Sequence, residues 1–425
     1  MNAPQTLREA SCADDYDPNA MAVDRARALI RQFLAPVTAT ERVHIRAALD
    51  RVLAQDVVSP IAVPSHDNSA MDGWAVRFAD LGTSGETELK RIGESFAGKP
   101  HAGPIGPGET VRIFTGGIMP EGADSVVMQE RAKEIAGGVR IPAGALPKAG
   151  QNRRFAGEDL KRGEVVFHVG QPVRPAELGM LASLGINEVT VYRKLRVAFF
   201  STGDELKSIG TELAEGQIYD SNRYTLHGML TRLNCDIVDM GVVPDVPEEL
   251  ERAFAAAAAS ADVVITSGGV SVGEADYVRQ LLDKLGEVLF WKIAMKPGRP
   301  LAYGKIGGAH LFGLPGNPVA VMVTFYAFVR DALLLLSGRR DVGPMPMFKA
   351  ALSAPIRKAP GRTEYQRGIL SPDETGGWTV RTTGDQGSGI LSSMSRANCF
   401  IVLPTQTGNV AAGEMVDVQL LEGLI

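Results

Sequence analysis

The spacing of apolar residues near the N-terminus predicts helices. Residues 21–34 (MAVDRARALIRQFL) repeat apolar side chains at helical spacing, and residues 43–54 (VHIRAALDRVLA) place them four apart. Both patterns are typical of short amphipathic helices, so residues 21–55 are predicted to form N-terminal helices. Residues 1–20 are polar and carry no such pattern, and we expect a mobile N-terminus there.

The next region has the pattern of β structure. Short runs such as VRIFT, SVVMQE, VRIP and EVVFHV lie between turns rich in glycine and proline, from about residue 56 to residue 185. This pattern favours either one all-β region or a pair of small β-rich lobes. We assign residues 56–160 to a β-rich domain and residues 161–190 to a segment that returns from it.

After residue 190, apolar strands alternate with helices. The predicted strands are LRVAFF, DIVDMGVV, ADVVITS and VLFWKIA. The predicted helices are residues 221–233, PEELERAFAAAAAS, YVRQLLDKLG and NPVAVMVTFYAFVRDALLLLSG, the last with Asn317 as N-cap. The alternation predicts a doubly wound α/β domain over residues 191–343. Ligands of such sheets bind at the carboxyl ends of the strands.

The C-terminal region returns to short strands and turns. The runs KAALSAPIRK, EYQRGILS, GWTVRTT, CFIVLP and MVDVQLL lie within residues 344–425. They predict a small β-barrel or sandwich, and we favour the barrel. The fold class is therefore multidomain α/β plus β: a doubly wound α/β domain with a β-rich N-terminal part and a small C-terminal β-barrel domain.

Composition narrows the classes of function. The 425 residues are too many for one core, and 45% apolar with 22% charged residues is the balance of a soluble globular protein. A net charge of −5 without a dense Lys/Arg run argues against a nucleic-acid partner. Three distant cysteines argue against a disulfide framework or a cysteine zinc site, and for a reducing compartment. We find no secretory signal, and runs such as AFVRDALLLL are too short or interrupted to span a bilayer.

A glycine-rich loop, TSGGVSVGEADY (266–277), follows a predicted strand. Gly268, Gly269 and Ser271 leave backbone N–H groups accessible, as in loops that bind phosphate. Glu274 and Asp276 would repel a phosphate unless a divalent cation lies between, and Mg²⁺ bridges carboxylates and phosphates in this way. The alternative is that both acids face solvent at a helix start, where they favour the helix dipole.

Other strand ends carry further candidates. In STGDEL, Gly203 allows a close turn beside Glu205, although a capped turn explains the motif equally well. In YDSNRYTL, Ser221 or Asn222 either caps the next helix or leaves its N-terminus to an anion.

Two later loops carry further candidate residues. KIAMKPGRP brings Lys292, Lys296 and Arg299 around a Pro-Gly turn, which favours an oxyanion clamp over a solvated turn. GLPGNPVA, with Pro315 and Pro318, begins a helix at the same sheet edge.

Polar motifs also occur outside the α/β region. HDNSAMDGWAV contains Asp72, and FTGGIMPEGADSVVMQE contains Thr115. RTEYQRG and GDQGSGILSSM supply Arg367 and Ser388 near the C-terminus. Turns between strands are the structural alternative for the first two motifs.

These motifs occur in one order over almost the whole chain: NSAMDGWAV, RIFTGGIMPEGADSVVMQE, STGDEL, DSNRY, TSGGVSVGEADY, KPGRP, GLPGNPV and QGSGILSSM. The chain thereby resembles the molybdopterin molybdenumtransferase family, known as MoeA in bacteria and as the E domain of gephyrin in animals. The resemblance implies four domains in an elongated, L-shaped subunit that dimerises, with residues 21–55 and 161–190 in the arm. It also implies a molybdopterin-binding role for the α/β domain.

The implied activity is the last step of molybdenum cofactor assembly. Adenylylated molybdopterin and molybdate enter, AMP leaves with Mg²⁺ present, and molybdenum is held by the pterin dithiolene. The resemblance further implies a cytoplasmic homodimer and contact with a molybdopterin adenylyltransferase. Nothing in it implies a nucleic acid or a membrane as partner.

Motif by motif, the resemblance assigns a site. The implied catalytic residues are Glu205, Asp245, Asp276, Lys292, Lys296 and Asp72, with Glu205 and Asp276 on the metal. The implied substrate-binding residues are Thr115, Asp220, Ser221, Gly268, Gly269, Ser271, Pro315, Pro318, Arg367 and Ser388. Asp72 and Thr115 would reach the cleft from the other subunit. Trp74 and Gly389 depart from the Tyr or Phe and the His common in the family, and the second leaves the Ser388 loop less certain.

Two readings from other classes stay open. The gephyrin E domain also binds a receptor, so this fold can serve as an interaction module. A molybdopterin adenylyltransferase shares the α/β domain, but needs neither the β-rich arm nor the C-terminal domain. Consumption of ATP would indicate the adenylyltransferase, whereas release of AMP from preformed adenylate would indicate the molybdenumtransferase.

Overall fold

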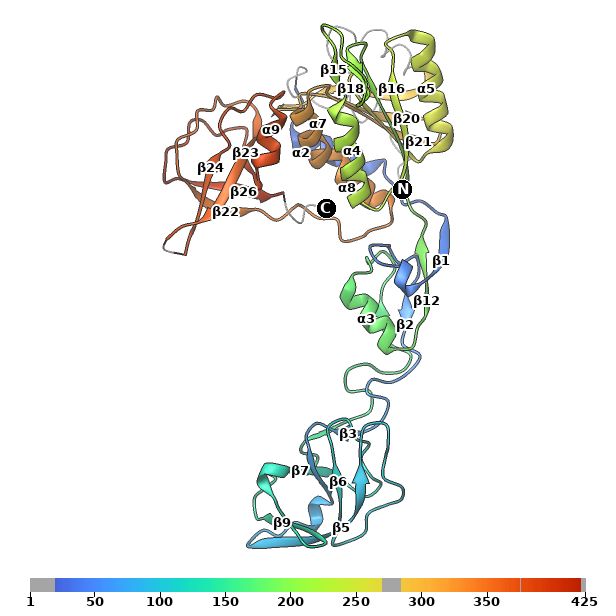
Figure 1. Cartoon of the computed structure of the whole chain (residues 1–425), viewed down its shortest axis with the longest axis vertical. Helices are drawn as coiled ribbons and strands as arrows, with labels where there is room; N and C mark the ends of the chain where they lie inside the picture. The colour runs from blue at the N-terminus through green and yellow to red at the C-terminus, as the bar shows by residue number, and fades with distance from the viewer. Residues whose placement is uncertain (1–19, 270–283, 375, 422–425) are drawn as a thin grey trace, which may run out of the picture.

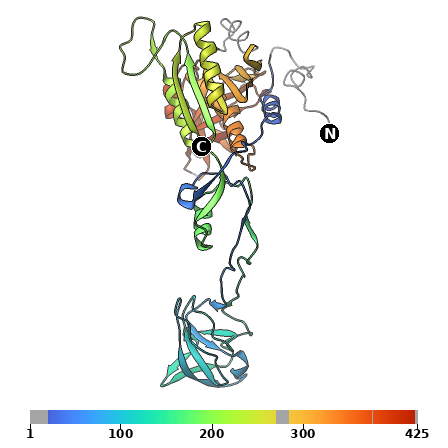
Figure 2. The same cartoon turned by 90° about the vertical axis from the view of Figure 1, so that its right-hand side faces the viewer.

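The molecule is elongated and carries different domains at its two ends. The computed structural model describes residues 20–269, 284–374 and 376–421. An α/β domain and a β-barrel lie side by side at one end, a small arm leads away from them, and a β domain occupies the other end (Figure 1, Figure 2).

A six-stranded sheet forms the centre of the α/β domain. Its order is β16 (Asp236–Val243), β13 (Arg196–Thr202), β17 (Val263–Ser267), β21 (Ala309–Leu314), β20 (Pro300–Ile306) and β18 (Gly286–Lys292). The first four strands are parallel, whereas β20 is antiparallel to both of its neighbours. The α/β prediction is confirmed, but the sequence pattern did not indicate β20. A short parallel pair, β14 (Leu206–Lys207) and β15 (Ile218–Tyr219), follows β13 and precedes α4 in the sequence.

Helices cover both faces of this sheet. Because side chains alternate along a strand, Val197 and Phe199 of β13 point to one face and Ala198 and Phe200 to the other. The helix α5 (Pro247–Ser260) packs on the second face. The first face carries α2 (Val23–Gln32), α4 (Ser221–Arg232), α7 (Pro318–Thr324), the π-helical turn η4 (Phe325–Val329) and α8 (Arg330–Leu336). Most of the predicted helix YVRQLLDKLG lies outside the described residues.

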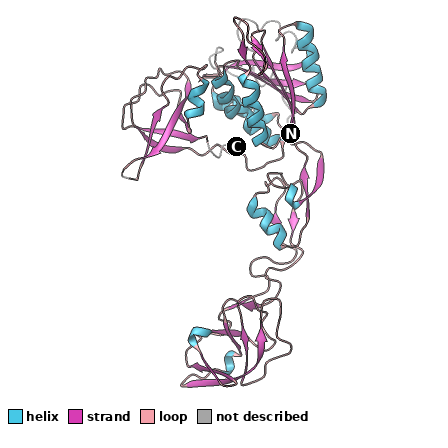
Figure 3. Cartoon of the chain, viewed as in Figure 1, coloured by secondary structure: helices cyan, strands magenta, loops and turns pink. Residues whose placement is uncertain are grey.

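One continuous helical run is long and apolar enough to cross a membrane. It spans Pro318–Leu336, so our expectation that every apolar run is too short or interrupted was wrong. Its most apolar window is 72% buried inside the protein, where its residues join the main hydrophobic core. It lies between the sheet and the barrel, as a core helix does (Figure 3).

The C-terminal strands close into a barrel, as predicted. They are β22 (Phe348–Leu352), β23 (Thr363–Pro372), β24 (Trp378–Thr382), β25 (Cys399–Leu403) and β26 (Met415–Leu420). The barrel closes because β23 pairs with both β24 and β25. A short strand after β18, β19 (Met295–Lys296), adds to β23 in parallel and ties the barrel to the α/β domain. The C-terminal domain also contains the helix α9 (Leu391–Arg396).

The arm differs from its prediction in three respects. Residues 43–54 do not form a helix: β1 (Thr40–His44) pairs with β12 (Glu188–Tyr192), and a short 3-10 turn, η1 (Ile45–Ala47), follows. The residues that carry the spacing do not share one buried face: Ile45 lies in η1, Leu49 is 43% exposed in a turn, and Leu53 is buried and bridges Val191 of β12. The arm also contains β2 (Val57–Val58), β11 (Val165–Phe167) and a helix not predicted, α3 (Pro175–Ser183).

The third difference concerns α2. Its residues Val23, Ala26, Leu29 and Ile30 belong to the main core of the α/β domain, not to the arm. The helix begins just after Met21, whose backbone N–H donates to the carbonyl of Lys292 at 2.6 Å. The described part of the chain therefore begins against the α/β domain and enters the arm only at β1.

The far end of the molecule is a six-stranded sheet in the order β7-β4-β6-β5-β9-β8. Its strands are β4 (Gly73–Val76), β5 (Glu86–Ser95), β6 (Glu109–Ile113), β7 (Ser125–Met128), β8 (Lys133–Ile135) and β9 (Gly138–Pro142). A small pair, β3 (Asn68–Ser69) with β10 (Arg153–Arg154), and the turns η2 (Phe78–Asp80) and η3 (Gln129–Arg131) accompany it. We call this unit the distal domain.

Candidate functional site

The carboxyl ends of three parallel strands meet at one edge of the α/β sheet. Ser201 of β13 lies opposite Ser267 of β17, which lies opposite Leu314 of β21. The Ser201 and Ser267 hydroxyls are 3.1 Å apart. The loops STGDEL, TSGG and GLPGNP therefore leave the sheet side by side, where ligands of such folds bind. We call this place the carboxyl edge.

Gly268 allows two of these loops to approach closely. Its φ is +92°, and a Cβ at this position would lie 2.5 Å from the carbonyl oxygen of Thr202. Its N–H donates to the carbonyl of Leu314 at 3.2 Å. Gly269 follows with a φ of +67°. Any side chain at Gly268 would push β13 and the glycine loop apart, so glycine is required for the shape of the edge.

Four buried oxygen atoms at this edge have no hydrogen-bond partner among the described residues. They are Asp220 Oδ2, Asn222 Oδ1, Thr202 Oγ1 and Thr266 Oγ1. Asp220 is the N-cap of α4, since its side chain accepts from the N–H of Arg223 at 3.1 Å. Asn222 donates from Nδ2 to the carbonyl of Gly316 at 2.7 Å. Buried polar atoms are normally paired, so unpaired ones gathered at strand ends are typical of a ligand site.

Sequence reasoning found only part of this set. Asp220 was implied by the family resemblance, whereas Asn222 was considered only as a cap of α4. Asp220 takes that role, and Asn222 instead ties α4 to the GLPGNP turn. Thr202 and Thr266 were not singled out, because a threonine at the end of an apolar strand has no distinctive pattern. Ser221 is the first helical residue of α4 and is half-buried.

The predicted acids gather on loops at the same edge. The Glu205 carboxylate lies over Gly203, where a Cβ would be 2.6 Å from its Oε2. The N–H of Asp245, after β16, donates to Asp204 Oδ1 at 3.3 Å. Ser271, Glu274 and Asp276 lie outside the described residues. Among the described residues no cluster of three or more His, Cys, Asp or Glu side chains could hold a metal.

The oxygen atoms at the edge suit a hard cation. Mg²⁺ prefers oxygen ligands and usually keeps several waters, so it needs only one or two carboxylates. Glu205, Asp220, Asn222, Thr202 and Thr266 carry oxygen atoms of the kind that Mg²⁺ binds. Because the described residues form no ready cluster of acids, the metal-ligand roles of Glu205 and Asp276 stay predictions.

The two predicted lysines lie at the end of β18 and in the short strand β19 that follows it. This strand is antiparallel to β20, which is antiparallel to β21, so Lys292 ends β18 on the carboxyl edge. Both lysine side chains are exposed. Lys296 Nζ is 3.9 Å from Glu364 Oε1 of the barrel, and Gln366 Nε2 donates to Glu364 Oε2 at 2.9 Å. The loop is held close to α7, because a Cβ on Gly298 would lie 2.4 Å from Thr324 Oγ1.

The barrel contacts the first turn of α7 through the Ser388 loop. The Ser388 carbonyl accepts from the N–H of Val319, in the first turn of α7, at 3.1 Å. Next to it in the fold, Pro315 is buried and Pro318 begins α7 as predicted. Ser388 is therefore placed beside the GLPGNP turn.

Arg367 has a different position from the one expected of an oxyanion ligand. It is 1% exposed, and burial lowers the pKa of its guanidinium. Its Nε donates to Ser393 Oγ at 2.9 Å and its Nη2 to the Gly387 carbonyl at 3.0 Å. In this arrangement Arg367 holds the Ser388 loop from behind. Direct contact between Arg367 and an anion stays a prediction that needs movement of that loop.

Asp72 and Thr115 lie together at the other end of the molecule. The N–H and the hydroxyl of Thr115 both donate to Asp72 Oδ1, each at 2.8 Å. These bonds hold the pKa of the Asp72 carboxyl below its usual value. The distal domain is separated from the α/β domain by the arm (Figure 1). Within one chain, these residues and the carboxyl edge therefore do not form one site.

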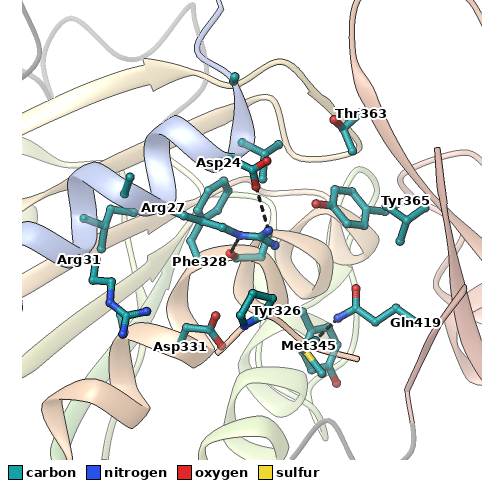
Figure 4. A pocket seen from close by; sticks show the side chains of 18 of the residues that line it. Asp24, Arg27, Arg31, Tyr326, Phe328, Asp331, Met345, Thr363, Tyr365 and Gln419 are labelled. Carbon is teal, nitrogen blue, oxygen red and sulfur yellow. Dashed lines mark hydrogen bonds and ion pairs between the residues drawn. The ribbon is translucent and has the colours of Figure 1, made fainter. Parts of the chain in front are cut away.

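A cavity of about 500 Å³ lies elsewhere, between α2, η4 and the barrel. Figure 4 shows Arg27 and Asp24 of α2 facing Tyr326 and Tyr365 across it. Arg27 Nε donates to the carbonyl of Ala327 at 2.8 Å, so its guanidinium is partly used within the protein. None of the predicted site residues lines this cavity, and no motif indicated it.

Three family descriptions match successive parts of the chain. Residues 21–185 match the MoeA N-terminal region (domain I and II), residues 201–334 a probable molybdopterin binding domain, and residues 349–421 the MoeA C-terminal region (domain IV).

Relatives match over nearly the full length. The chain is 46% identical over 405 residues to the molybdopterin molybdenumtransferase of Haemophilus influenzae, covering 95% of this chain and 100% of that one. It is 37% identical over 385 residues to that of a Nostoc species, covering 89% and 88%. The crystal structure of the molybdopterin biosynthesis moeA protein from Pyrococcus horikoshii OT3 matches with a TM-score of 0.82 at 30% identity, over 95% of this chain and 100% of that one.

The matched regions follow one another in a single order, and the full-length structural match includes arm, distal domain and barrel. We conclude that the chain belongs to the molybdopterin molybdenumtransferase (MoeA) family of transferases, which act in molybdenum cofactor biosynthesis.

Proposed function

We propose that this transferase inserts molybdenum from molybdate into adenylylated molybdopterin, in a Mg²⁺-dependent reaction that releases AMP. The observation that carries the proposal is the set of unpartnered buried oxygens at the carboxyl edge, beside two exposed lysines. A cation-binding and an anion-binding surface meet there, as a reaction between two polyanions requires.

The anionic substrates need local recognition because the chain carries a net charge of −5. Lys292 and Lys296 present ammonium groups on one loop at the edge, and the Ser388 loop closes it from the barrel side. We assign molybdate to this half of the cleft, with the lysines as charged hydrogen-bond donors to its oxygens. Glu364 beside Lys296 orients that lysine when the anion is absent.

The pyrophosphate belongs on the glycine loop and the N-terminal turn of α4. Gly268 and Gly269 leave room for phosphate close to the backbone, and the helix N-terminus favours negative charge. Glu205 and Asp276 would hold the metal. When bound, Mg²⁺ supplies Lewis-acid polarisation of the phosphoanhydride and neutralises its charge. The protein side chains orient the two substrates and exclude water from between them.

We further propose that the active form is a cytoplasmic homodimer. Asp72 and Thr115 are at the opposite end of the elongated molecule from the carboxyl edge, so a second copy would have to bring them to that edge. Delivery of the adenylate by a molybdopterin adenylyltransferase would limit loss of an unstable intermediate, and this contact is likewise a proposal.

Reconstitution tests the proposal directly. Protein, adenylylated molybdopterin, Mg²⁺ and molybdate should release AMP and activate a molybdenum-free apoenzyme. Omission of Mg²⁺ should stop AMP release, and omission of molybdate should stop apoenzyme activation. Consumption of ATP with free molybdopterin would instead identify an adenylyltransferase. If neither AMP nor active enzyme formed, an interaction module without this chemistry would remain.

A further inference from the structure

A buried carboxylate of the barrel lies beside Lys296, where the barrel meets the α/β domain. Strand β19 pairs in parallel with β23, and in that register Lys296 is the partner of Glu364. Lys296 Nζ is 3.9 Å from Glu364 Oε1, and the two side chains are 52% and 8% exposed. The carboxylate is therefore fixed inside the protein, whereas the flexible lysine side chain is free to exchange it for another partner at the surface.

The barrel holds Glu364 on its inner side. Glu364 and Gln366 lie opposite Leu403 and Ile401 of β25, and both of these belong to the core of the barrel. Directly opposed residues of antiparallel strands point to the same face, so Glu364 and Gln366 point inward as well. Gln366 Nε2 donates to Glu364 Oε2 at 2.9 Å. This bond fixes the carboxylate in position but supplies no positive charge.

A second lysine lies near Glu364 but is bound elsewhere. Lys358 is 5% exposed, and its Nζ donates to the carbonyls of Thr407 at 2.7 Å and Ala359 at 3.3 Å. Burial lowers the pKa of the Lys358 ammonium, and the charge of Glu364 acts against that shift. Within the described part of the chain, Lys296 is the cation that reaches Glu364 within 4.0 Å. Lys296 is therefore the exchangeable partner of this carboxylate.

An oxyanion at the carboxyl edge would have to displace Glu364 from Lys296. A lysine that is paired with a carboxylate presents less net charge to an anion than a free lysine does. Glu364 also repels an anion bound next to Lys296, and its burial keeps water from screening that repulsion. Separating the pair leaves a buried carboxylate with less compensation, which takes away part of the free energy gained on binding. Glu364 should therefore weaken the binding of an oxyanion.

We propose that Glu364 is a positioning residue that competes with molybdate for Lys296 and thereby limits the affinity of the carboxyl edge for oxyanions. In the empty site Lys296 is neutralised against the barrel, and a bound anion releases it from there. The inference rests on the proposed function, because that function assigns Lys296 to molybdate. It identifies a residue whose neutralisation improves binding, which is the opposite of what a substrate ligand does.

Neutralising Glu364 tests the competition. Glu364→Gln removes the charge but keeps an oxygen for the bond from Gln366. The dissociation constant for molybdate, measured by equilibrium dialysis of the whole protein with Mg²⁺, should fall about threefold to tenfold. Glu364→Asp keeps the charge and should bind molybdate as the wild type does. Unchanged or weaker binding in a folded Glu364→Gln variant, or undetectable binding in both proteins, would overturn the proposal.

Two further variants control for folding and for position. If Glu364→Gln alone does not fold, the double variant with Lys358→Met removes the buried cation that would be left uncompensated, and it carries the same expectation. Asp417→Asn is the matched control, because Asp417 Oδ1 pairs with Lys349 Nζ at 2.8 Å elsewhere in the same barrel. Asp417→Asn should leave the dissociation constant for molybdate unchanged, and an equal improvement there would show a general charge effect and contradict the competition.

A double-mutant cycle tests whether the effect passes through Lys296. In a Lys296→Ala background, most of the improvement caused by Glu364→Gln should disappear. An improvement of the same size in both backgrounds would mean that Glu364 acts on the anion without Lys296, and would overturn the exchange of partners. Failure of the proposed function gives a different result: the wild type would bind molybdate in dialysis but would neither release AMP nor activate the apoenzyme.

Discussion

Asp220 allows the ligand role of the carboxyl edge to be separated from its role in folding. The side chain is 1% exposed; Oδ1 caps α4, and Oδ2 has no partner among the described residues. Asp220→Asn keeps an oxygen for the cap but removes the charge. Asp220→Ala removes both oxygens.

The expected stability follows from two opposing contributions. An N-cap stabilises a helix by about 1 kcal/mol. A buried polar atom without a hydrogen bond costs about 1–3 kcal/mol. Removing both should leave Asp220→Ala between unchanged and about 2 kcal/mol more stable than the wild type. A helix cap with a purely structural role would instead lose about 1 kcal/mol.

Activity should change in the opposite direction. If Oδ2 meets the substrate or the ion bound to it, each variant loses a charge-assisted hydrogen bond of about 1.5–3 kcal/mol, and kcat/KM falls at least about tenfold. The assays are denaturant unfolding and AMP release in the reconstituted reaction. Asp56→Asn is the control, because that carboxylate caps a turn in the arm by accepting from Val169 N–H at 2.8 Å. Wild-type activity in Asp220→Asn, or a loss of about 1 kcal/mol in Asp220→Ala, would refute the reasoning.

Three further outcomes follow from the geometry. Gly268→Ala should lower the free energy of unfolding by about 2 kcal/mol or more, measured by chemical denaturation, because its Cβ would meet backbone 2.5 Å away at a φ of +92°; wild-type stability would contradict it. Burial opposes ionisation of Asp262, but the Arg193 guanidinium and the backbone N–H of Arg196 outweigh it and lower its pKa below 3.8. Ionised Asp262 therefore stabilises the folded protein above that pH, and this stabilisation is lost as the pH falls through the folded pKa. Asp262→Asn should flatten the acid limb of a plot of melting temperature against pH, and an unchanged acid limb would show that the Asp262–Arg193 pair is not responsible. Lys292→Ala and Lys296→Ala should each raise the molybdate concentration needed for half-maximal activity about tenfold, and normal activity at limiting molybdate would exclude them.

Local patterns predicted the elements that carry their own apolar signal. The strand LRVAFF is a continuous apolar run because both of its faces are buried, and the helix PEELERAFAAAAAS has apolar residues at helical spacing. Residues 300–306 were missed because β20 follows a Pro-Gly turn directly and pairs antiparallel with β21, without the intervening helix that marks a doubly wound fold. Residues 43–54 were misassigned because the spacing of four between Ile45, Leu49 and Leu53 does not mark one buried face, since Leu49 is exposed in a turn.

The same distinction explains which residues of the candidate site could be found from the sequence. Motifs located Glu205, Lys292 and the glycine loop, since each lies in an unusual local sequence. Thr202 and Thr266 were invisible because their significance depends on the missing partner of a buried hydroxyl, which is a property of packing. Arg367 shows the converse: its motif was found, but only the fold reveals that its guanidinium lies behind the Ser388 loop.

The elongated shape bears on why the reaction would need two chains. The carboxyl edge supplies oxygens and lysines suited to phosphates, metal and molybdate, whereas Asp72 and Thr115 belong to the distal domain across the arm (Figure 1). If both surfaces contact one substrate, different copies of the chain bind it. Dilution below the dimer dissociation constant should then raise KM before it lowers the melting temperature of the α/β domain, because that domain has its own core. A KM independent of protein concentration, in a chain shown to be monomeric by sedimentation, would rule out this division of labour.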